Sequence, residues 1–199
     1  MSKIISFAGL DGSGKTTQAQ LLKDELEQQG YKVFLCNPMH HPENLKKLKD
    51  ASDAINVDYE EFFGSEIVGV LHLLDVWNCI NEVMKNSTNY DYIIFERYLL
   101  DFYVYSRLLN SNLEFQKCLI EATQQPSVYI FLDVPVSVSK ARVNERDEIR
   151  CRKSNYQSSS EARELFLKEI NRYNHKIIDA DGKSMDDVHN EIMIAIKNT

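Results

Sequence analysis

Apolar residues gather in five short runs along the chain, and each run has the length of a buried β-strand. They span residues 3–8, 31–36, 92–96, 128–134 and, more weakly, 176–180. Between the first two runs, apolar residues recur at helical spacing over 16–29, and Gly30 follows as a C-cap. Because strands alternate with helices, the pattern predicts an α/β fold, a doubly wound parallel sheet of about five strands flanked by helices.

Two further helices follow from the same pattern. Residues 62–84 are apolar on nearly every side, which predicts a central core helix buried all round, with a subunit interface (a homodimer) as the second interpretation. The last helix is expected to start at Ser184, because Asp187 three residues later completes a start that resembles a capping box.

Composition narrows the class of protein. The chain has 199 residues, 43% of them hydrophobic, and no repeat or Gly/Pro-rich linker, so one domain spanning 1–199 is expected. Its 23 basic and 30 acidic side chains give a net charge of −7, which disfavours the binding of nucleic-acid polymers but still allows small anionic ligands to bind.

The expected location is the cytoplasm. Four scattered cysteines favour free thiols in a reducing compartment, and no apolar run is long enough to span a membrane.

A glycine-rich loop carries the strongest chemical signal. Residues 9–16, GLDGSGKT, fit the pattern G-x-x-x-x-G-K-[ST] between a predicted strand and a predicted helix. Glycines let successive backbone N–H groups point at phosphate oxygens, Lys15 can bridge the β- and γ-phosphates, and the Thr16 hydroxyl can ligate Mg²⁺. The predicted ATP-binding residues of this segment are Gly9, Leu10, Asp11, Gly12, Ser13, Gly14, Lys15, Thr16 and Thr17.

Motifs later in the chain indicate which class of protein carries this phosphate-binding loop (P-loop). The chain lacks the N-K-x-D motif that reads guanine, which disfavours a GTPase. Four later segments resemble the thymidylate kinase family of P-loop nucleotide kinases and follow the family's order. They are Glu96-Arg97-Tyr98 with Tyr105 downstream, Leu132–Pro135, the helix carrying Arg142 and Arg146, and Ile178-Asp179-Ala180.

This resemblance implies roles on the acceptor side. Arg97 would clamp the acceptor phosphate with Tyr98 beside it, and Glu96 would hold Mg²⁺ or its water shell. Tyr105 would lie against the sugar and disfavour a ribose 2′-hydroxyl. Asp11 would turn away from the ATP phosphates, towards Arg97 and the acceptor's 3′-hydroxyl.

The resemblance also implies a mobile lid over ATP around 142–160. Arg142, Arg146 and Arg150 stand four residues apart, so they would share one helix face. Family members with glycine rather than arginine at the position of Gly12 draw a catalytic arginine from the lid, so the resemblance implies that Arg146 or Arg150 neutralises the transferring phosphoryl group. Arg142 and Ala180 would contribute to ATP binding.

The positions that contact the base depart from the family. His72 and Val76 replace a phenylalanine and an arginine, Asp101 replaces a serine, Ser106 replaces a glutamine, and Asn37-Pro38 replaces glutamate-proline. Asp101 could read an amino-bearing base such as cytosine, or face solvent or pair with Arg107. His72 could stack on the base or be a core histidine.

The sequence therefore predicts a Mg²⁺-dependent kinase that transfers the γ-phosphate of ATP to a deoxynucleoside monophosphate, most simply dTMP. The same fold with another acceptor (dCMP, a nucleoside or a phosphorylated metabolite) is the first alternative, and an ATP-binding regulatory ATPase is the second. The expected partners are small nucleotides, without a nucleic-acid polymer or a membrane.

Overall fold

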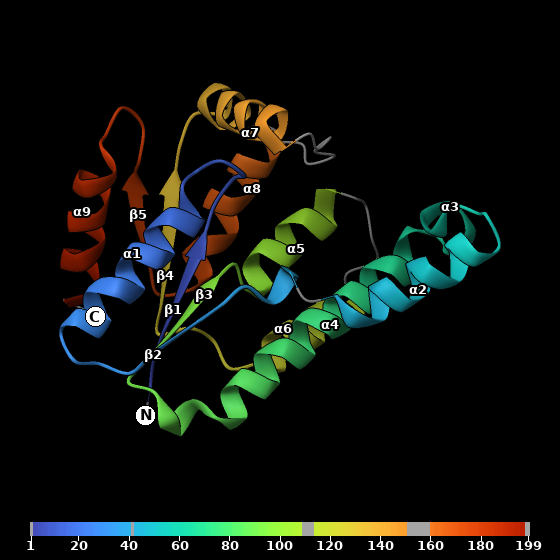
Figure 1. Ribbon diagram of the computed structural model, residues 1–199, viewed down its shortest axis with the longest axis horizontal. Coiled ribbons are helices and arrows are strands. Elements are labelled where there is room, and N and C mark those ends of the chain that lie inside the picture. Colours follow the sequence, from blue (N-terminus) through green and yellow to red (C-terminus); the bar gives the residue numbers. More distant parts are fainter. Residues whose placement is uncertain (1, 41, 109–113, 151–159, 198–199) are drawn as a thin grey trace.

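The structure is a computed structural model that describes residues 2–40, 42–108, 114–150 and 160–197. Five parallel strands form one sheet in the order β2-β3-β1-β4-β5 (Figure 1). The strands are β1 (Lys3–Ala8), β2 (Val33–Cys36), β3 (Tyr92–Glu96), β4 (Val128–Asp133) and β5 (His175–Asp179). The predicted α/β class and the five parallel strands are confirmed.

Nine α-helices lie within the described part of the chain. They are α1 (Lys15–Gln28), α2 (Glu43–Ala54), α3 (Tyr59–Phe63), α4 (Ser65–Lys85), α5 (Leu99–Leu108), α6 (Glu114–Ala122), α7 (Val136–Arg150), α8 (Ser160–Glu169) and α9 (Met185–Lys197). As expected, α9 follows Ser184, whose hydroxyl accepts the backbone N–H of Asp187 at 3.1 Å.

Neighbouring residues of each central strand point to opposite faces of the sheet, and helices cover both faces, so both sets of side chains are buried. Ile4 and Ile93 pack with α4, α5 and α8, whereas Ile5 and Ile94 pack with α1 and α9. In Figure 1, α1 and α9 accordingly cover one face, and α5 and α8 lie on the other. The two faces explain why the strands are continuous apolar runs rather than alternating ones.

The boundaries of the second strand and of the first helix differ slightly from the prediction. The predicted strand begins at Tyr31, but the backbone N–H of Tyr31 donates to Leu26 O at 3.1 Å and closes the end of α1. Gly30, with φ +91°, makes this turn. β2 therefore begins only at Val33.

The predicted core helix over 62–84 is wrong in two respects. Gly64, with φ +78°, separates α3 from α4, so there are two helices. Only the stripe containing Leu73, Val76 and Ile80 is fully buried, whereas Ile67 is 52% exposed. In Figure 1, α2, α3 and the first half of α4 project away from the sheet.

α2 is attached to α4 through one carboxylate. Asp75, buried in α4, accepts the backbone N–H groups of Asn44 and Leu45 at 3.0 Å each, and the Asn44 side-chain amide at 2.7 Å. These bonds satisfy N–H groups at the start of α2, where its N-cap residue, Pro42, makes no side-chain cap. The projecting helices are therefore tied to the core by a buried hydrogen-bonded carboxylate.

The expectation that no apolar run is long enough to span a membrane is wrong by length and composition alone, because the stretch Glu66–Lys85 of α4 meets both criteria. A helix that packs in a protein core has the same composition. Here α4 contacts α2, α3 and α5, which accounts for its buried stripe without a membrane.

Candidate active site

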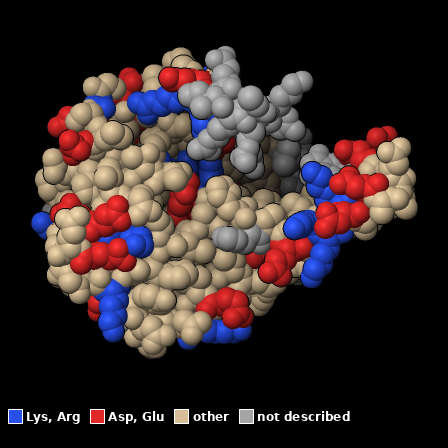
Figure 2. Space-filling model, viewed as in Figure 1, with Lys and Arg blue, Asp and Glu red and all other residues tan. Residues whose placement is uncertain are grey.

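The phosphate-binding loop lies at the carboxyl edge of the sheet, between the end of β1 and the start of α1. β1 is flanked by β3 and β4, and the chain passes to opposite sides of it, so the loop occupies the switch point of the sheet. Figure 2 shows a hollow beneath α7 at this edge, with basic side chains inside it. Ligands of open α/β sheets bind at this position.

Two positions of the loop require glycine, because other parts of the backbone pass too close for a side chain. A Cβ atom on Gly9 would lie 2.7 Å from Leu132 O, and one on Gly12 would lie 2.8 Å from Ser139 O. Both residues also have positive φ, 142° and 75°. The bare backbone lets the loop pack against the end of β4 and the first turn of α7.

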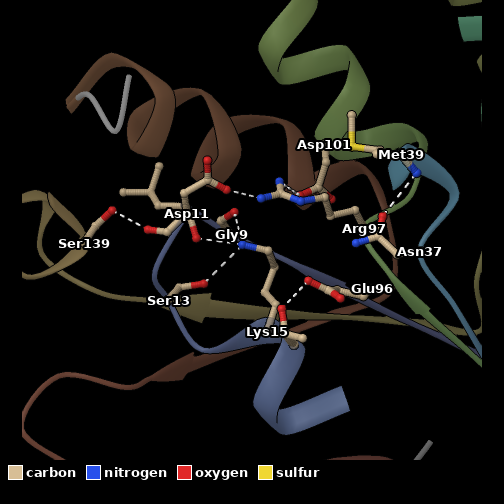
Figure 3. Close-up of polar contacts among 12 residues, drawn as sticks. Gly9, Asp11, Ser13, Lys15, Asn37, Met39, Glu96, Arg97, Asp101 and Ser139 are labelled. Carbon is tan, nitrogen blue, oxygen red and sulfur yellow. Dashed lines mark hydrogen bonds and ion pairs between the residues drawn. The ribbon is translucent and has the colours of Figure 1, made fainter. Parts of the chain in front are cut away.

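Lys15 lies beneath the loop and is almost completely buried. Its Nζ donates to Gly9 O at 2.8 Å and to Leu10 O at 2.6 Å (Figure 3). Burial, reinforced by the positive charge of Arg97, lowers the pKa of Lys15 to about 7. An anionic ligand would favour the charged form, so the site is adapted to phosphate.

Arg97 lies directly after β3, next to the loop. Its φ is +74°, in the left-handed region that residues other than glycine rarely adopt, and its N–H donates to Phe7 O at 2.9 Å. The guanidinium forms ion pairs with Asp11 and, at 3.2 Å, with Asp101 (Figure 3). It also lies 5.6 Å from the centre of the Tyr105 ring.

The charges around Arg97 are mutually dependent. Burial alone would lower the pKa of Arg97, but Tyr105, Asp101 and Asp11 offset that effect and raise it. Burial raises the pKa of Asp101 to about 6, against the opposing effect of Arg97 and Lys15. The arginine therefore stays charged and is held rigidly from two sides.

The expected turn of Asp11 towards Arg97 is confirmed by their ion pair. The interpretations of Asp101 as solvent-facing or paired with Arg107 are wrong. Asp101 is fully buried and accepts hydrogen bonds from Arg97 Nη1 at 3.2 Å and from the backbone N–H of Tyr98 at 3.4 Å. Arg107 instead lies 3.6 Å from Glu169.

Two oxygen-bearing side chains meet at the start of α1. The Thr16 hydroxyl donates to Glu96 Oε1 at 2.5 Å. A hydroxyl and a carboxylate are the hard oxygen ligands that Mg²⁺ prefers, completed by phosphates and water. Among residues 2–40, 42–108, 114–150 and 160–197, no three His, Cys, Asp or Glu side chains are arranged so that they could hold a metal ion, so a metal here would depend on the nucleotide.

The three candidate lid arginines lie on one continuous helix, α7. Arg142 Nη1 donates to Gly12 O at 3.3 Å, which places it against the phosphate loop. Arg146 follows one turn later and is half-buried. The side chain of Arg150 and residues 151–159 of the predicted lid lie outside the described residues.

The side chains of two predicted acceptor residues make their contacts away from Arg97, Asp11 and Asp101. Tyr98 is fully buried, and its hydroxyl donates to Gln124 O at 2.7 Å. His72 lies edge-on to Phe102, with 5.6 Å between the ring centres, and burial lowers its pKa. Ala180 follows β5 at the carboxyl edge of the sheet, and its backbone N–H donates to Asp133 O at 2.9 Å. Thr17 lies in the first turn of α1 and is exposed.

Sequence reasoning missed two contacts that hold this edge together. Ser139 Oγ donates to Asp11 O at 2.5 Å, and Arg163 of α8 binds both oxygens of Asp133 at 2.7 and 2.6 Å. These contacts join residues that are 128 and 30 positions apart. No local pattern marks either partner.

The sheet order, the phosphate loop with its lysine and the buried Arg97 after the neighbouring strand β3 define a P-loop nucleotide kinase. Residues 7–192 match the thymidylate kinase family, and the chain belongs to that family.

Curated relatives are similar over nearly their whole length. A probable thymidylate kinase of Methanococcus aeolicus is 26% identical over 204 residues, covering 97% of this chain and 95% of its own. Probable thymidylate kinase 1 of Saccharolobus solfataricus is 27% identical over 201 residues, covering 100% and 99%. A solved structure of a deoxyadenosine kinase from M. mycoides has a TM-score of 0.67 at 15% identity, covering 98% of this chain and 100% of its own, which shows a shared fold.

Proposed function

We propose that the protein transfers the γ-phosphate of ATP to dTMP, giving dTDP and ADP. The observation that carries the proposal is that two buried cations lie close together at this edge of the sheet. Lys15 is held by the phosphate loop, and Arg97, directly after β3, is held by Asp11 and Asp101. One cation serves the donor and the other serves an acceptor phosphate. Family membership and the relatives named probable thymidylate kinases support dTMP as that acceptor.

On the donor side, the backbone of residues 9–14 and the ammonium of Lys15 would hold the ATP phosphates. Thr16 and Glu96 would hold Mg²⁺, because they already bring a hydroxyl and a carboxylate within 2.5 Å of each other. When bound, the ion neutralises phosphate charge. Arg142 would approach the phosphates from α7, and Arg146 or Arg150 would neutralise the transferring group as the lid closes.

On the acceptor side, Arg97 would bind the monophosphate, and Asp11 would accept a hydrogen bond from the sugar's 3′-hydroxyl. Tyr105 would lie against the deoxyribose. Asp101 acts through Arg97, since it holds the guanidinium from the side opposite to Asp11. The roles of Tyr98 and His72 in acceptor binding remain predictions, and their contacts favour structural roles.

The test is ADP release with a panel of acceptors. The panel contains dTMP, dUMP, dCMP, dAMP, dGMP and thymidine, each with ATP and Mg²⁺, together with a reaction lacking any acceptor. Turnover should require an acceptor and be fastest with dTMP. Faster turnover of another acceptor would refute dTMP as the substrate, and equal ADP release without any acceptor would refute the kinase itself.

We further infer that the protein is cytoplasmic and forms a homodimer through the first half of α4. Cys36, Cys79 and Cys118 are free thiols, which suits a reducing compartment. Only 28% of the most apolar stretch of α4 is buried, and Glu66, Ile67, Val70 and Leu71 line a shallow pocket of about 290 Å³ on it. An exposed apolar helix face of this kind is typical of a subunit interface.

A further inference from the structure

We propose that Asn37, a position that the family resemblance groups with the base contacts, is instead a further ligand of the acceptor's phosphate, in addition to Arg97; this inference rests on the proposed function. Asn37 follows β2 directly. Cys36 is in register with Phe95 of β3, so Asn37 lies alongside Glu96 and next to Arg97 at the same edge of the sheet. The chain thus brings a third side chain to the acceptor side of the site.

The orientation of the Asn37 carboxamide is fixed by its own turn. Its Oδ1 accepts the backbone N–H of Met39 at 3.1 Å, and the backbone N–H of His40 donates to Asn37 O at 3.1 Å. An amide oxygen is required opposite an N–H donor, so Nδ2 must occupy the other position. Figure 3 shows this nitrogen on the side of the carboxamide that faces Arg97 and Glu96.

The Nδ2 group is buried and makes no hydrogen bond within the described part of the chain. A buried donor without a partner costs free energy, because it has lost its hydrogen bonds to water. A ligand that supplies an acceptor atom at this point would remove that cost. The unpaired donor therefore marks a position where a bound molecule is expected.

The chemistry of the surroundings identifies the bound group. An NH₂ group donates and cannot ligate a cation, so Asn37 is not part of the Thr16–Glu96 metal site. Its neighbour Arg97 is a permanently charged donor, and both would face the same ligand. Two donors side by side, one of them cationic, favour an anionic oxygen, and the acceptor's phosphate is the anion that this edge of the sheet is proposed to receive.

Two substitutions test the contact. Asn37→Asp keeps an oxygen for the Met39 N–H but replaces the donor with a negative oxygen. Asn37→Ala removes both the Nδ2 donor and the oxygen that accepts the Met39 N–H, without adding charge. Isothermal titration calorimetry would measure the binding of dTMP and of thymidine, which lacks the phosphate. We expect dTMP binding to weaken roughly tenfold with Ala and more with Asp, while thymidine binding changes less than about twofold.

Asn89→Asp is the matched control. It adds the same charge in the turn before β3, at the opposite edge of the sheet, and should leave both ligands unaffected. Thermal unfolding of each variant checks that the fold is retained.

Unchanged dTMP binding in both Asn37 variants would overturn the inference, and so would an equal loss of thymidine and dTMP binding, which would place the contact on the nucleoside. The proposed function is judged separately, by the turnover of the wild-type protein with dTMP. If that turnover is normal and the variants bind dTMP normally, only the inference fails. If the wild-type protein neither binds nor phosphorylates dTMP, both fail.

Discussion

At the scale of single residues, Lys15 and Arg97 are two buried cations that share one group of carboxylates. Asp11, Asp101 and Glu96 all raise the pKa of Lys15, but burial and the charge of Arg97 outweigh them. The ammonium is consequently poised to lose its proton near neutral pH, whereas the guanidinium keeps its charge. If Lys15 binds the donor and Arg97 the acceptor, as proposed, the two substrates would meet cations of different character, one titratable and one permanent.

The depressed pKa of Lys15 predicts that ATP binding takes up a proton at alkaline pH. At pH 8 a group of pKa about 7 is mostly neutral, and the phosphates would restore its charge, so roughly 0.9 proton is taken up. Calorimetric titrations in two buffers of different ionisation enthalpy measure this number. Lys15→Arg, which stays charged, is the control and should remove the uptake; equal uptake by both proteins would contradict the assignment.

The same shift gives a stability prediction with a definite sign. The pKa of Lys15 in the folded protein lies near 7, below the ordinary value of 10.5, so between these values the unfolded chain binds more protons. The contribution of this group to the free energy of unfolding therefore rises with pH from about 7 to 10.5 and is smallest below pH 7. Urea unfolding across this range, with Lys15→Met as the reference, would isolate it.

Replacing Arg97 should affect the acceptor far more than the donor. Arg97→Ala removes the proposed phosphate clamp and leaves Asp11 and Asp101 facing each other without a cation. The KM for dTMP should rise and kcat should fall, together lowering kcat/KM at least 100-fold, while the KM for ATP changes little. Initial-rate kinetics with each substrate varied in turn provide the check, and unaltered acceptor kinetics would contradict the role of Arg97.

At the scale of elements, the contact between the phosphate loop and α7 depends on the absence of a side chain at Gly12. A Cβ there would meet Ser139 O at 2.8 Å and Arg142 Cβ at 3.3 Å. The hydrogen bonds from Ser139 to Asp11 O and from Arg142 to Gly12 O join the same two elements. The loop and α7, the helix that carries the predicted lid arginines, are thus joined by direct contacts.

Gly12→Ala should therefore destabilise the protein and weaken ATP binding. Gly30→Ala is the matched control, because Gly30 also has a positive φ, +91°, but a Cβ there meets nothing within 4 Å. The control should cost only the backbone strain, about 1 kcal/mol, and Gly12→Ala should cost at least about 1 kcal/mol more. Chemical denaturation of the two variants gives the difference; equal losses would show that the loop does not need this close approach.

At the scale of the whole molecule, α2, α3 and the first half of α4 project from the sheet and leave an apolar surface exposed (Figure 1). In Figure 2 the projecting part carries both acidic and basic side chains around tan surface. In the proposed dimer a second copy of the chain would cover the apolar face, which would account for the apolar residues of α4 that this chain alone does not bury.

Ile67→Glu should convert the proposed dimer into a monomer, because it would bury an unpaired carboxylate in the interface. Light scattering after size-exclusion chromatography measures the mass. Glu82→Gln, an exposed change near the other end of α4, serves as the control and should stay dimeric. A wild-type protein that is monomeric at all concentrations tested would contradict the dimer.

The phosphate loop, the five strands and the start of α9 could be predicted because the signals are local. Gly9–Thr16 is contiguous, each strand is one apolar run, and Ser184 lies three residues from its capping partner. The ion pair of Asp11 with Arg97 joins residues 86 apart, and it was accessible only through the family resemblance. The partner of Asp101 could not be predicted, because Arg97 and Arg107 both lie close to it in the sequence. Only the fold shows that Arg97 pairs with Asp101, whereas Arg107 pairs with Glu169.

The sequence by itself determined the class of sheet and the phosphate-binding loop, because periodicity and contiguous motifs encode these features. The acceptor-side role of Arg97 came from the family resemblance and stays a prediction. Only the tertiary structure decided which carboxylates hold Arg97, how α7 meets the loop, and that Asn37 presents an unpaired donor beside the clamp. It also decided which side of α4 is buried. The physical reason is that burial and ion pairing depend on distances between elements, and hydrophobic spacing along one helix does not distinguish a core from an interface.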